Sequence, residues 1–532
     1  MKKQLRILLG CLSIGVLFTS TTLANQPIDY AKMVKLYADE MLRNGQDHYG
    51  KQSSPLFSTA LLRESKPTLL PYPQFQRRKE KSNPGNRWVF ETYFLNIPML
   101  GSPKNGSREN GDHGMEKPHK QTISGDDPLD NLGVYKAFFL LSDYTGIKKY
   151  KKEATKSLKW FYEHTQGPSG LYPWGEHMGW DFRHDYVTYH IKGHEDFILN
   201  PYKGNSAEPI TELYQSWEHE PRGMYTEWEP FLEILADLPA GKDEFYKPIE
   251  KYSLGIWEQH FFDKDNGFYN RHGDYFGLKR SIEGTYGSDM MFPKYTGYFM
   301  ETWSVAYQHS DNPQFKSQIS EYIRKLIKGN KIIRNKFGFR ASLITGGEYD
   351  TRQCLQMAYQ AIKSGKRIEK ENTELGMEMI SFGKSEIDFF CNYIGNDIDK
   401  YKSGDPETLY YAYLATEDNR LLEMYYKIIA GIISDGDKMM YYNAGEAAKC
   451  IESMLNMYQL SGDKKYLKEA GKRGEQAVNL YFTKDSCLPK CVPANYITCV
   501  DNKIWRTFYY AHLGSDDLMA ALMKLSIALK NP

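Results

Sequence analysis

The sequence contains no long hydrophobic run beyond residue 24, and this absence argues against a membrane-spanning helix in the rest of the chain. No later stretch approaches the roughly 18 apolar residues that a span requires. Net charge is also nearly absent, at +1 from 68 basic and 67 acidic side chains. No bulk field therefore gathers nucleic acid or an anionic membrane, and we expect neither nucleic acid nor a membrane span among the partners.

Strand signals and cysteine motifs are scarce as well. Alternating apolar and polar residues with Asn-Gly or Asp-Gly turns are few, so no large sheet is expected. There are seven cysteines but no Cys-x-x-Cys pair, which makes a structural zinc site a weak hypothesis. A disulfide among the last three or four is one expectation, and buried thiols are the other: Cys450, Cys487, Cys491 and Cys499.

The N-terminus has the pattern of an export signal. Three basic residues, Lys2, Lys3 and Arg6, precede an apolar run from Ile7 to Phe18, and Ala24 offers a small residue for cleavage. A lipid-anchor box ending at Cys11 is a weaker alternative, because apolar residues continue beyond it. We expect a periplasmic or secreted protein in which residues 1–24 are the signal and residues 25–532 are one domain.

Aromatic residues are abundant, with 41 Tyr and 9 Trp. Such side chains combine a flat apolar face with a hydrogen-bonding group, which suits the C–H faces and hydroxyls of sugars. Most of them are expected to fill the seams between helices. Only clusters near turns are candidates for binding.

One sequence unit occurs twice and predicts a helical hairpin. Lys148 to Ala154 is repeated as Lys464 to Ala470, and each copy follows an apolar helical stretch and a short turn. Weaker copies are expected at 229–260, 301–327 and 407–433. Helices at about 29–43 and 515–530 are expected to pair. The pattern predicts an all-α fold, an (α/α) toroid of about six hairpins, with residues 51–124 largely loop.

Histidine and tryptophan concentrate in the segment that follows the first hairpin. We expect catalysis from His177 and substrate contacts from its neighbours Trp174, Glu176, Trp180, Asp181 and His184. One alternative is structural, with His177 and His184 capping helix ends. Another is a divalent metal on His177, Asp181 and His184, although Gly175 and Gly179 disfavour the helix it needs. No cofactor is otherwise expected.

A second cluster lies on a turn that Pro221 and Gly223 keep from being helical. His219, Arg222 and Tyr225 are predicted to be catalytic, with Trp217 and Glu218 in contact with substrate. They suit β-elimination on a uronic acid, which needs a group that neutralises the carboxylate, a base for the C5 proton and an acid for the leaving oxygen. Glycoside hydrolysis is the alternative and needs two carboxyl groups, from Glu176, Asp181, Glu218 and Glu220.

Four further residues are candidates to line the same site: Asn131, Tyr295, Arg506 and His512. Structural roles are the stronger interpretation for them. Asn131 is suited to cap a helix, and Tyr and Arg are common at helix starts and interfaces.

Three strings carry a resemblance to known enzymes: Asp126-Asp127…Asn131, Trp174-Gly175-Glu176-His177…Trp180-Asp181, and Ser216-Trp217-Glu218-His219-Glu220-Pro221-Arg222. With the hairpin pattern over most of the chain, they resemble bacterial polysaccharide lyases of the (α/α) toroid type and the related unsaturated-glucuronyl hydrolases. The resemblance implies a lyase acting on a uronate-containing polysaccharide or oligosaccharide. A hydrolase on the same ring and a non-catalytic glycan-binding protein are the alternatives.

Overall fold

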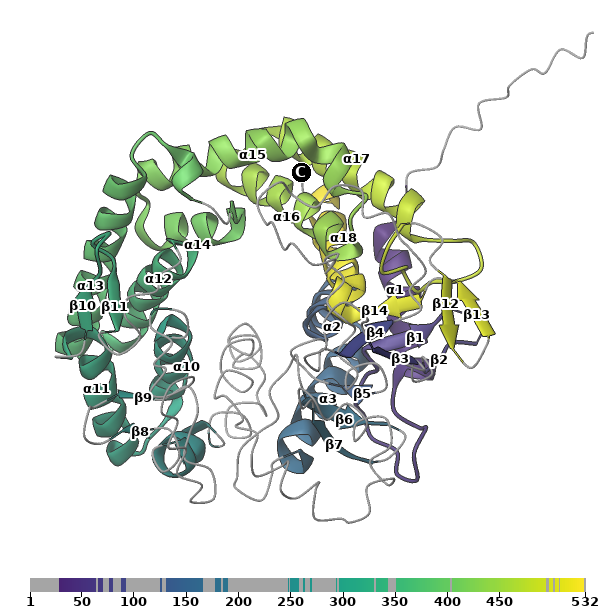
Figure 1. Cartoon of the computed structure of the whole chain (residues 1–532), viewed down its shortest axis with the longest axis horizontal. Coiled ribbons are helices and arrows are strands. Elements are labelled where there is room, and N and C mark those ends of the chain that lie inside the picture. Colours follow the sequence, from purple (N-terminus) through teal and green to yellow (C-terminus); the bar gives the residue numbers. More distant parts are fainter. Residues whose placement is uncertain are drawn as a thin grey trace, which may run out of the picture.

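The computed structural model consists of helical hairpins in two layers along an arc (Figure 1). It describes residues 28–63, 66–69, 76–79, 88–91, 125–126, 131–165, 178–182, 185–189, 247, 249–257, 262–263, 268–269, 293, 296–329, 332–342, 351–401, 404–493, 497–500, 503–506 and 508–530. In this part of the chain the inner layer contains α10 (Thr296–His309), α12 (Thr351–Ile368), α14 (Pro406–Thr416), α16 (Ala444–Ser461), α18 (Ser515–Lys530) and α2 (Leu132–Thr145). The outer layer contains α11 (Pro313–Lys328), α13 (Thr373–Ile394), α15 (Asn419–Met439), α17 (Lys464–Tyr481), α1 (Tyr30–Glu40) and α3 (Lys149–His164).

Each inner helix packs against the next one along the arc. The contacts run from α10 to α12, α14, α16, α18 and α2, and each outer helix packs on its inner partner. In the hairpins a short turn joins the inner helix to the outer helix that follows it. The prediction of an all-α (α/α) toroid is confirmed. The predicted pairing of the terminal helices is also confirmed, since α1 packs on α18.

Local capping explains where several helices begin. The Asn312 side chain accepts hydrogen bonds from the backbone N–H groups of Gln314 and Phe315, and Pro313 occupies the first helical position of α11. Asp405 and Pro406 start α14 in the same way. A side-chain acceptor followed by proline satisfies exposed backbone donors and fixes φ, so these starts are encoded locally.

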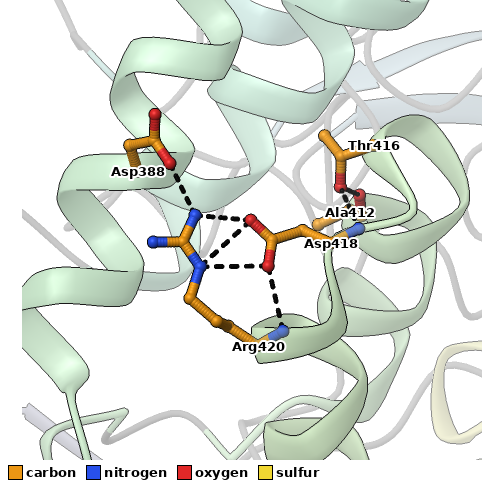
Figure 2. A network of polar contacts seen from close by, with 5 residues as sticks. All are labelled: Asp388, Ala412, Thr416, Asp418 and Arg420. Atoms are coloured by element: carbon orange, nitrogen blue, oxygen red, sulfur yellow. Dashed lines mark hydrogen bonds and ion pairs between the residues drawn. The ribbon is translucent and has the colours of Figure 1, made fainter.

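An ion-pair network fixes the turn between α14 and α15 (Figure 2). The Asp418 carboxylate accepts hydrogen bonds from the Arg420 guanidinium at 2.5–3.1 Å and from its backbone N–H at 2.9 Å. The same guanidinium donates to Asp388 of α13 at 2.5 Å. The network therefore ties two neighbouring hairpins together on the outer layer.

The core fills the seam between the layers and is rich in aromatic rings. The largest side chains that are fully buried are Trp303, Tyr37, Tyr135, Tyr150, Tyr322, Tyr425, Tyr481, Tyr509 and Phe57. Most come from helices of both layers. The expectation that many aromatics pack between helices is confirmed for these residues.

Strands in the described residues are short and form small sheets. Three-stranded sheets have the orders β14–β1–β2 and β5–β6–β7, and the remaining strands pair two by two. Their bounds are β1 (Ala60–Leu62), β2 (Thr68–Leu69), β3 (Gln76–Lys79), β4 (Trp88–Glu91), β5 (Gly125–Asp126), β6 (Met178–Asp181), β7 (Tyr186–Tyr189), β8 (Phe262–Asp263), β9 (Phe268–Tyr269), β10 (Ile332–Arg334), β11 (Arg340–Ser342), β12 (Ile497–Val500), β13 (Lys503–Arg506) and β14 (Phe508–Tyr510). Short helical turns are η1 (Met41–Gly45), η4 (Tyr252–Trp257), η5 (Ile398–Lys400) and η6 (Ala511–Leu513). β1–β4 lie in the segment expected to be largely loop, and β1 pairs with β14 just before α18.

The individual hairpin predictions differ in outcome. α2–α3, α10–α11, α14–α15 and α16–α17 confirm four predicted hairpins, whereas the one predicted at 229–260 lies mostly outside the described residues. The α12–α13 hairpin was not predicted. No disulfide joins the five cysteines whose side chains are described, Cys354, Cys391, Cys450, Cys487 and Cys491. The predicted disulfide is therefore wrong for Cys450, Cys487 and Cys491, and the side chain of Cys499 lies outside this part.

Candidate functional site

The first turns of three inner helices meet at one end of the ring, which we call the loop end. A Cβ on Gly133 of α2 would lie 2.4 Å from the backbone carbon of Asp516 in α18. A Cβ on Gly514, just before α18, would lie 2.2 Å from the Cα of Gly445 in α16. The glycines allow this close approach.

The described ends of two of the three strings that carry the family resemblance, Asp126 of one and Trp180-Asp181 of the other, lie side by side. In the antiparallel pair β5–β6, Asp126 is opposite Trp180 and Gly125 is opposite Asp181. β6 continues into β7, and Asp185 in the turn between them has a left-handed φ of 57°. Its carboxylate accepts hydrogen bonds from the backbone N–H groups of Lys51 and Gln52, at 2.8 and 3.2 Å. The sheet is thereby fastened to the segment that follows η1.

Trp180 is part of the wall of this region. The residue is 8% exposed, and its ring meets Trp160 of α3 edge to face, with centroids 5.0 Å apart. Trp160 in turn stacks on His164 at 4.3 Å. The buried indole N–H of Trp180 has no hydrogen-bond partner among the described residues. With so little of the side chain exposed, Trp180 has no open face on which a sugar could stack. Its packing against Trp160 instead holds β6 against α3.

Asn131 is buried at the start of α2. Its side-chain amide donates to the Phe57 carbonyl oxygen at 2.6 Å, and it makes no side-chain capping bond. The Asp516 carboxylate of α18 instead accepts the Val134 N–H at 3.2 Å. Burial, followed by the nearby Asp517 charge, raises the pKa of Asp516 well above its ordinary value. A side chain from the neighbouring helix thus satisfies a donor of α2, a role that Asn131 was expected to fill.

Most of the other predicted site residues lie outside the described part of the chain. They are His177, His219, Tyr225, Arg222, Trp174, Glu176, His184, Trp217, Glu218 and Tyr295. Three more are placed by their backbone alone: Asp181 in β6, Arg506 in β13 and His512 in η6. η6 directly precedes α18, which puts His512 at the loop end. The assignment of these side chains to a site stays a prediction.

A group of charged residues on the inner helices was not predicted from the sequence. We call it the interior wall: Lys136 of α2, Glu407 of α14, Glu446, Lys449 and Glu452 of α16, and Asp517 and Lys524 of α18. Lys524 donates to Glu452 at 2.7 Å, and Lys449 donates to Glu446 at 2.9 Å. These pairs stand on the layer that lines the inside of the arc (Figure 1).

The electrostatic environment separates two carboxyl groups of the interior wall. Glu407 is exposed to solvent, yet the protein around it raises the pKa of its carboxyl by desolvation, and Glu452 adds to the effect. Burial also raises the pKa of Glu452, but the charge and hydrogen bond of Lys524 outweigh it, so the net pKa is lowered. Neighbouring carboxyls with opposite shifts are a pattern that also occurs at acid–base catalytic sites.

Neither a metal cluster nor a membrane helix occurs in the described residues. Among them, no group of three or more His, Cys, Asp or Glu side chains is placed to hold a metal ion. The alternative metal site on His177, Asp181 and His184 concerns side chains outside this part. No helix that the structure describes is long and apolar enough to cross a bilayer.

Comparison with known proteins gives no sequence family. No family model matches the chain, and no curated protein matches it. Among solved structures, the chain is similar to cellobiose 2-epimerase from Bacillus thermoamylovorans B4167, with a TM-score of 0.36 and 9% identity over 76% of this chain and 88% of that one. For D-mannose isomerase the TM-score is 0.33 and the identity 11%, over 77% of this chain and 90% of that one. For a family 105 glycoside hydrolase of C. acetobutylicum ATCC 824 the TM-score is 0.29 and the identity 12%, over 75% of this chain and 93% of that one.

Proposed function

We propose that this protein is an exported carbohydrate-active enzyme that cleaves a uronate-containing polysaccharide by β-elimination at the loop end of the ring. The observation that carries the proposal is the β5–β6 pairing, which brings Asp126 of one string that resembles polysaccharide lyases beside Trp180 and Asp181 of another. Loops presented by a rigid scaffold are the usual place for such a site.

The proposed chemistry uses one cation, one base and one acid. Arg222 neutralises the uronate carboxylate, and His177 or His219 removes the proton at C5. The electron pair of the broken C5–H bond forms the C4–C5 double bond as the C4–O bond breaks. Tyr225 protonates the leaving oxygen. The products are a new chain end and a conjugated unsaturated uronate.

Replacement of the two histidines tests this proposal. At least one of the two variants, His177→Ala or His219→Ala, is expected to reduce formation of the ultraviolet-absorbing product by about 10²–10⁴-fold, the range for general acid–base groups. His164→Ala is the matched control, because that ring stacks on Trp160 and its Nδ1 lies 2.8 Å from the Trp160 carbonyl oxygen. Full activity in both active-site variants rejects the assignment.

Glycoside hydrolysis is the second candidate, and the interior wall favours it. Glu407, with its raised pKa, is suited to donate a proton, and Glu452, with its lowered pKa, is suited to stay ionised. If hydrolysis is the reaction, the wild type releases reducing ends and forms no ultraviolet-absorbing product. Glu407→Gln and Glu452→Gln are then each expected to abolish that release. Activity that survives both substitutions and produces absorbance favours elimination.

We further propose that export removes residues 1–24 and leaves residues 25–532 as a single catalytic domain in the periplasm or outside the cell. The basic and apolar residues before Ala24 support this. Mass spectrometry of the protein recovered from a periplasmic extract is expected to give a chain that begins at Asn25. A chain that retains Met1 after export contradicts cleavage.

A further inference from the structure

One face of α14 carries an exposed aromatic ring. Glu407, Tyr411 and Leu414 are exposed, with values of 42% for Tyr411 and 48% for Leu414. Thr408, Leu409, Tyr410 and Ala412 between them are buried. Positions four and seven residues apart share one side of a helix. Glu407, Tyr411 and Leu414 therefore form a single face that is open to solvent.

That face points toward the inside of the ring. In the inner layer α16 lies between α14 and α18, since α14 packs on α16 and α16 packs on α18. Even so, both Tyr411 and Glu407 interact electrostatically with Lys524 of α18. Glu407 also interacts with Lys136 of α2, one helix further along. α14, α16 and α18 all belong to the inner layer (Figure 1), so we infer that the exposed Glu407 and Tyr411 reach Lys524 over the inner surface of the arc.

The Tyr411 ring is supported from behind. Its centroid lies 6.0 Å from that of Tyr359 on α12, with a tilt of 31°, and 5.4 Å from that of Tyr410. Tyr359 is only 9% exposed, so it belongs to the packed wall. A ring held in this way loses little conformational entropy when a ligand binds to its open side.

Charged groups lie near the ring, since both Tyr411 and Glu407 interact electrostatically with Lys524. Glu407 is one helical turn away from Tyr411, which places the two Cβ atoms about 5–6 Å apart. The Glu452–Lys524 pair provides both acceptors and donors, and its side chains are 29% and 42% exposed. An aromatic face bordered by a few polar groups matches a pyranose, which has apolar C–H faces and hydroxyls at its edge.

We propose that Tyr411 is the platform of a saccharide-binding subsite inside the ring, where Glu407 and the Glu452–Lys524 pair bind the hydroxyls of the stacked pyranose. The inference rests on the proposed function and adds a second binding region to it. A substrate that is processed at the loop end extends along the inner face of α14. The ligand class is an oligosaccharide of several pyranose units.

Equilibrium binding to the full mature protein tests the subsite. The probes are hexasaccharides of polygalacturonate and of cellulose, measured by titration calorimetry. Tyr411→Ala is expected to weaken binding by about 3- to 10-fold, the equivalent of one aromatic contact. Tyr411→Phe is expected to bind within about 2-fold of the wild type, because it keeps the stacking face. Tyr411→Leu retains packing against Tyr359 without an aromatic face and is expected to match Tyr411→Ala, which covers the case in which the alanine variant is unstable.

Tyr426→Ala is the matched control, since Tyr426 is 37% exposed on the outer helix α15. It is expected to bind as the wild type does. Undiminished binding in Tyr411→Ala or Tyr411→Leu overturns the subsite, as does failure of the wild type to bind either probe. Binding that depends on Tyr411 without any turnover of the probe supports the subsite and rejects polygalacturonate as the substrate of the proposed lyase. Turnover of the probe with binding that does not depend on Tyr411 supports the proposed enzyme and rejects the subsite.

Discussion

Asp39 joins α1 to α3 through three donors. Its carboxylate accepts from Lys149 Nζ at 2.6 Å, Lys35 Nζ at 2.7 Å and the Tyr150 hydroxyl at 2.9 Å. Burial alone raises the pKa of Asp39, but these hydrogen bonds outweigh it and lower the pKa to about 2. Because the folded chain holds the ionised form, the stabilisation is present above the ordinary value of 3.8 and is lost as the pH falls toward 2.

Asp39→Asn is expected to lower the free energy of unfolding by about 2 kcal/mol at pH 7 and by much less at pH 2. Urea unfolding at both pH values measures this. Asp143→Asn is the control, since Asp143 is 68% exposed and its nearest cation, Lys151, is 3.6 Å away. An exposed pair of that kind contributes about 0–1 kcal/mol. Equal losses in the two variants contradict the role assigned to Asp39.

Asp47 has the opposite pH dependence. It is 2% exposed, and burial raises its pKa to about 6 even though Ser54 Oγ donates to it at 2.8 Å. The folded chain therefore binds this proton more tightly than the unfolded chain. Its contribution to stability is full below 3.8 and is lost as the pH rises through about 6, by up to about 3 kcal/mol. Plots of the free energy of unfolding against pH, for the wild type and Asp47→Asn, are expected to diverge between about pH 4 and pH 6. Parallel plots contradict the raised pKa of Asp47.

At the scale of the helix, close contact between α2 and α18 requires glycine at position 133. A Cβ there would meet the backbone of both Asp516 and Asp517 at 2.4 Å, and a backbone cannot move aside as a side chain does. Gly133→Ala is expected to lower the free energy of unfolding by about 1–3 kcal/mol through overpacking. Gly431→Ala in α15, where nothing lies within 4 Å, is expected to raise it by about 0.5–1 kcal/mol. Thermal unfolding of both variants checks the contrast, and an equal gain in both contradicts it.

Two of the confirmed hairpins have a proline or glycine in the turn, whereas the missed α12–α13 turn offers only the N-cap Asn372. Asn312 with Pro313 precedes α11, and Gly462 with Asp463 precedes α17. The turn between α12 and α13 reads Glu369-Lys370-Glu371-Asn372, which favours a continuous helix. The glycines of α13 also wrongly suggest a break in the helix. A Cβ on Gly376 or Gly383 would lie 2.5 or 2.4 Å from the partner backbone, so these residues serve close helix packing and do not break the helix.

At the scale of the whole molecule, the sequence predicts the ring better than it predicts the residues that meet inside it. The hairpin period is local, and so it is visible in a single chain. The β5–β6 pairing joins residues 125–126 to 180–181, and no sequence period encodes such a contact. Lys136, Glu407 and Lys524 each resemble an ordinary solvated helix position. They form one wall only because consecutive inner helices turn the same side inward.

The N-terminal helix is expected to be essential for folding, because it covers the seam beside α18. Val34, Tyr37 and Met41 are fully buried, and the Tyr37 hydroxyl lies 3.0 Å from that of Tyr509. Burial of such side chains contributes about 1.5–3 kcal/mol each, which together is comparable with a net stability of about 5–15 kcal/mol. A chain that begins at Gln46 is therefore expected to lose cooperative thermal unfolding, whereas one that begins at Asn25 keeps it. If the shorter chain melts cooperatively at the same temperature, the terminal pairing does not hold the ring together.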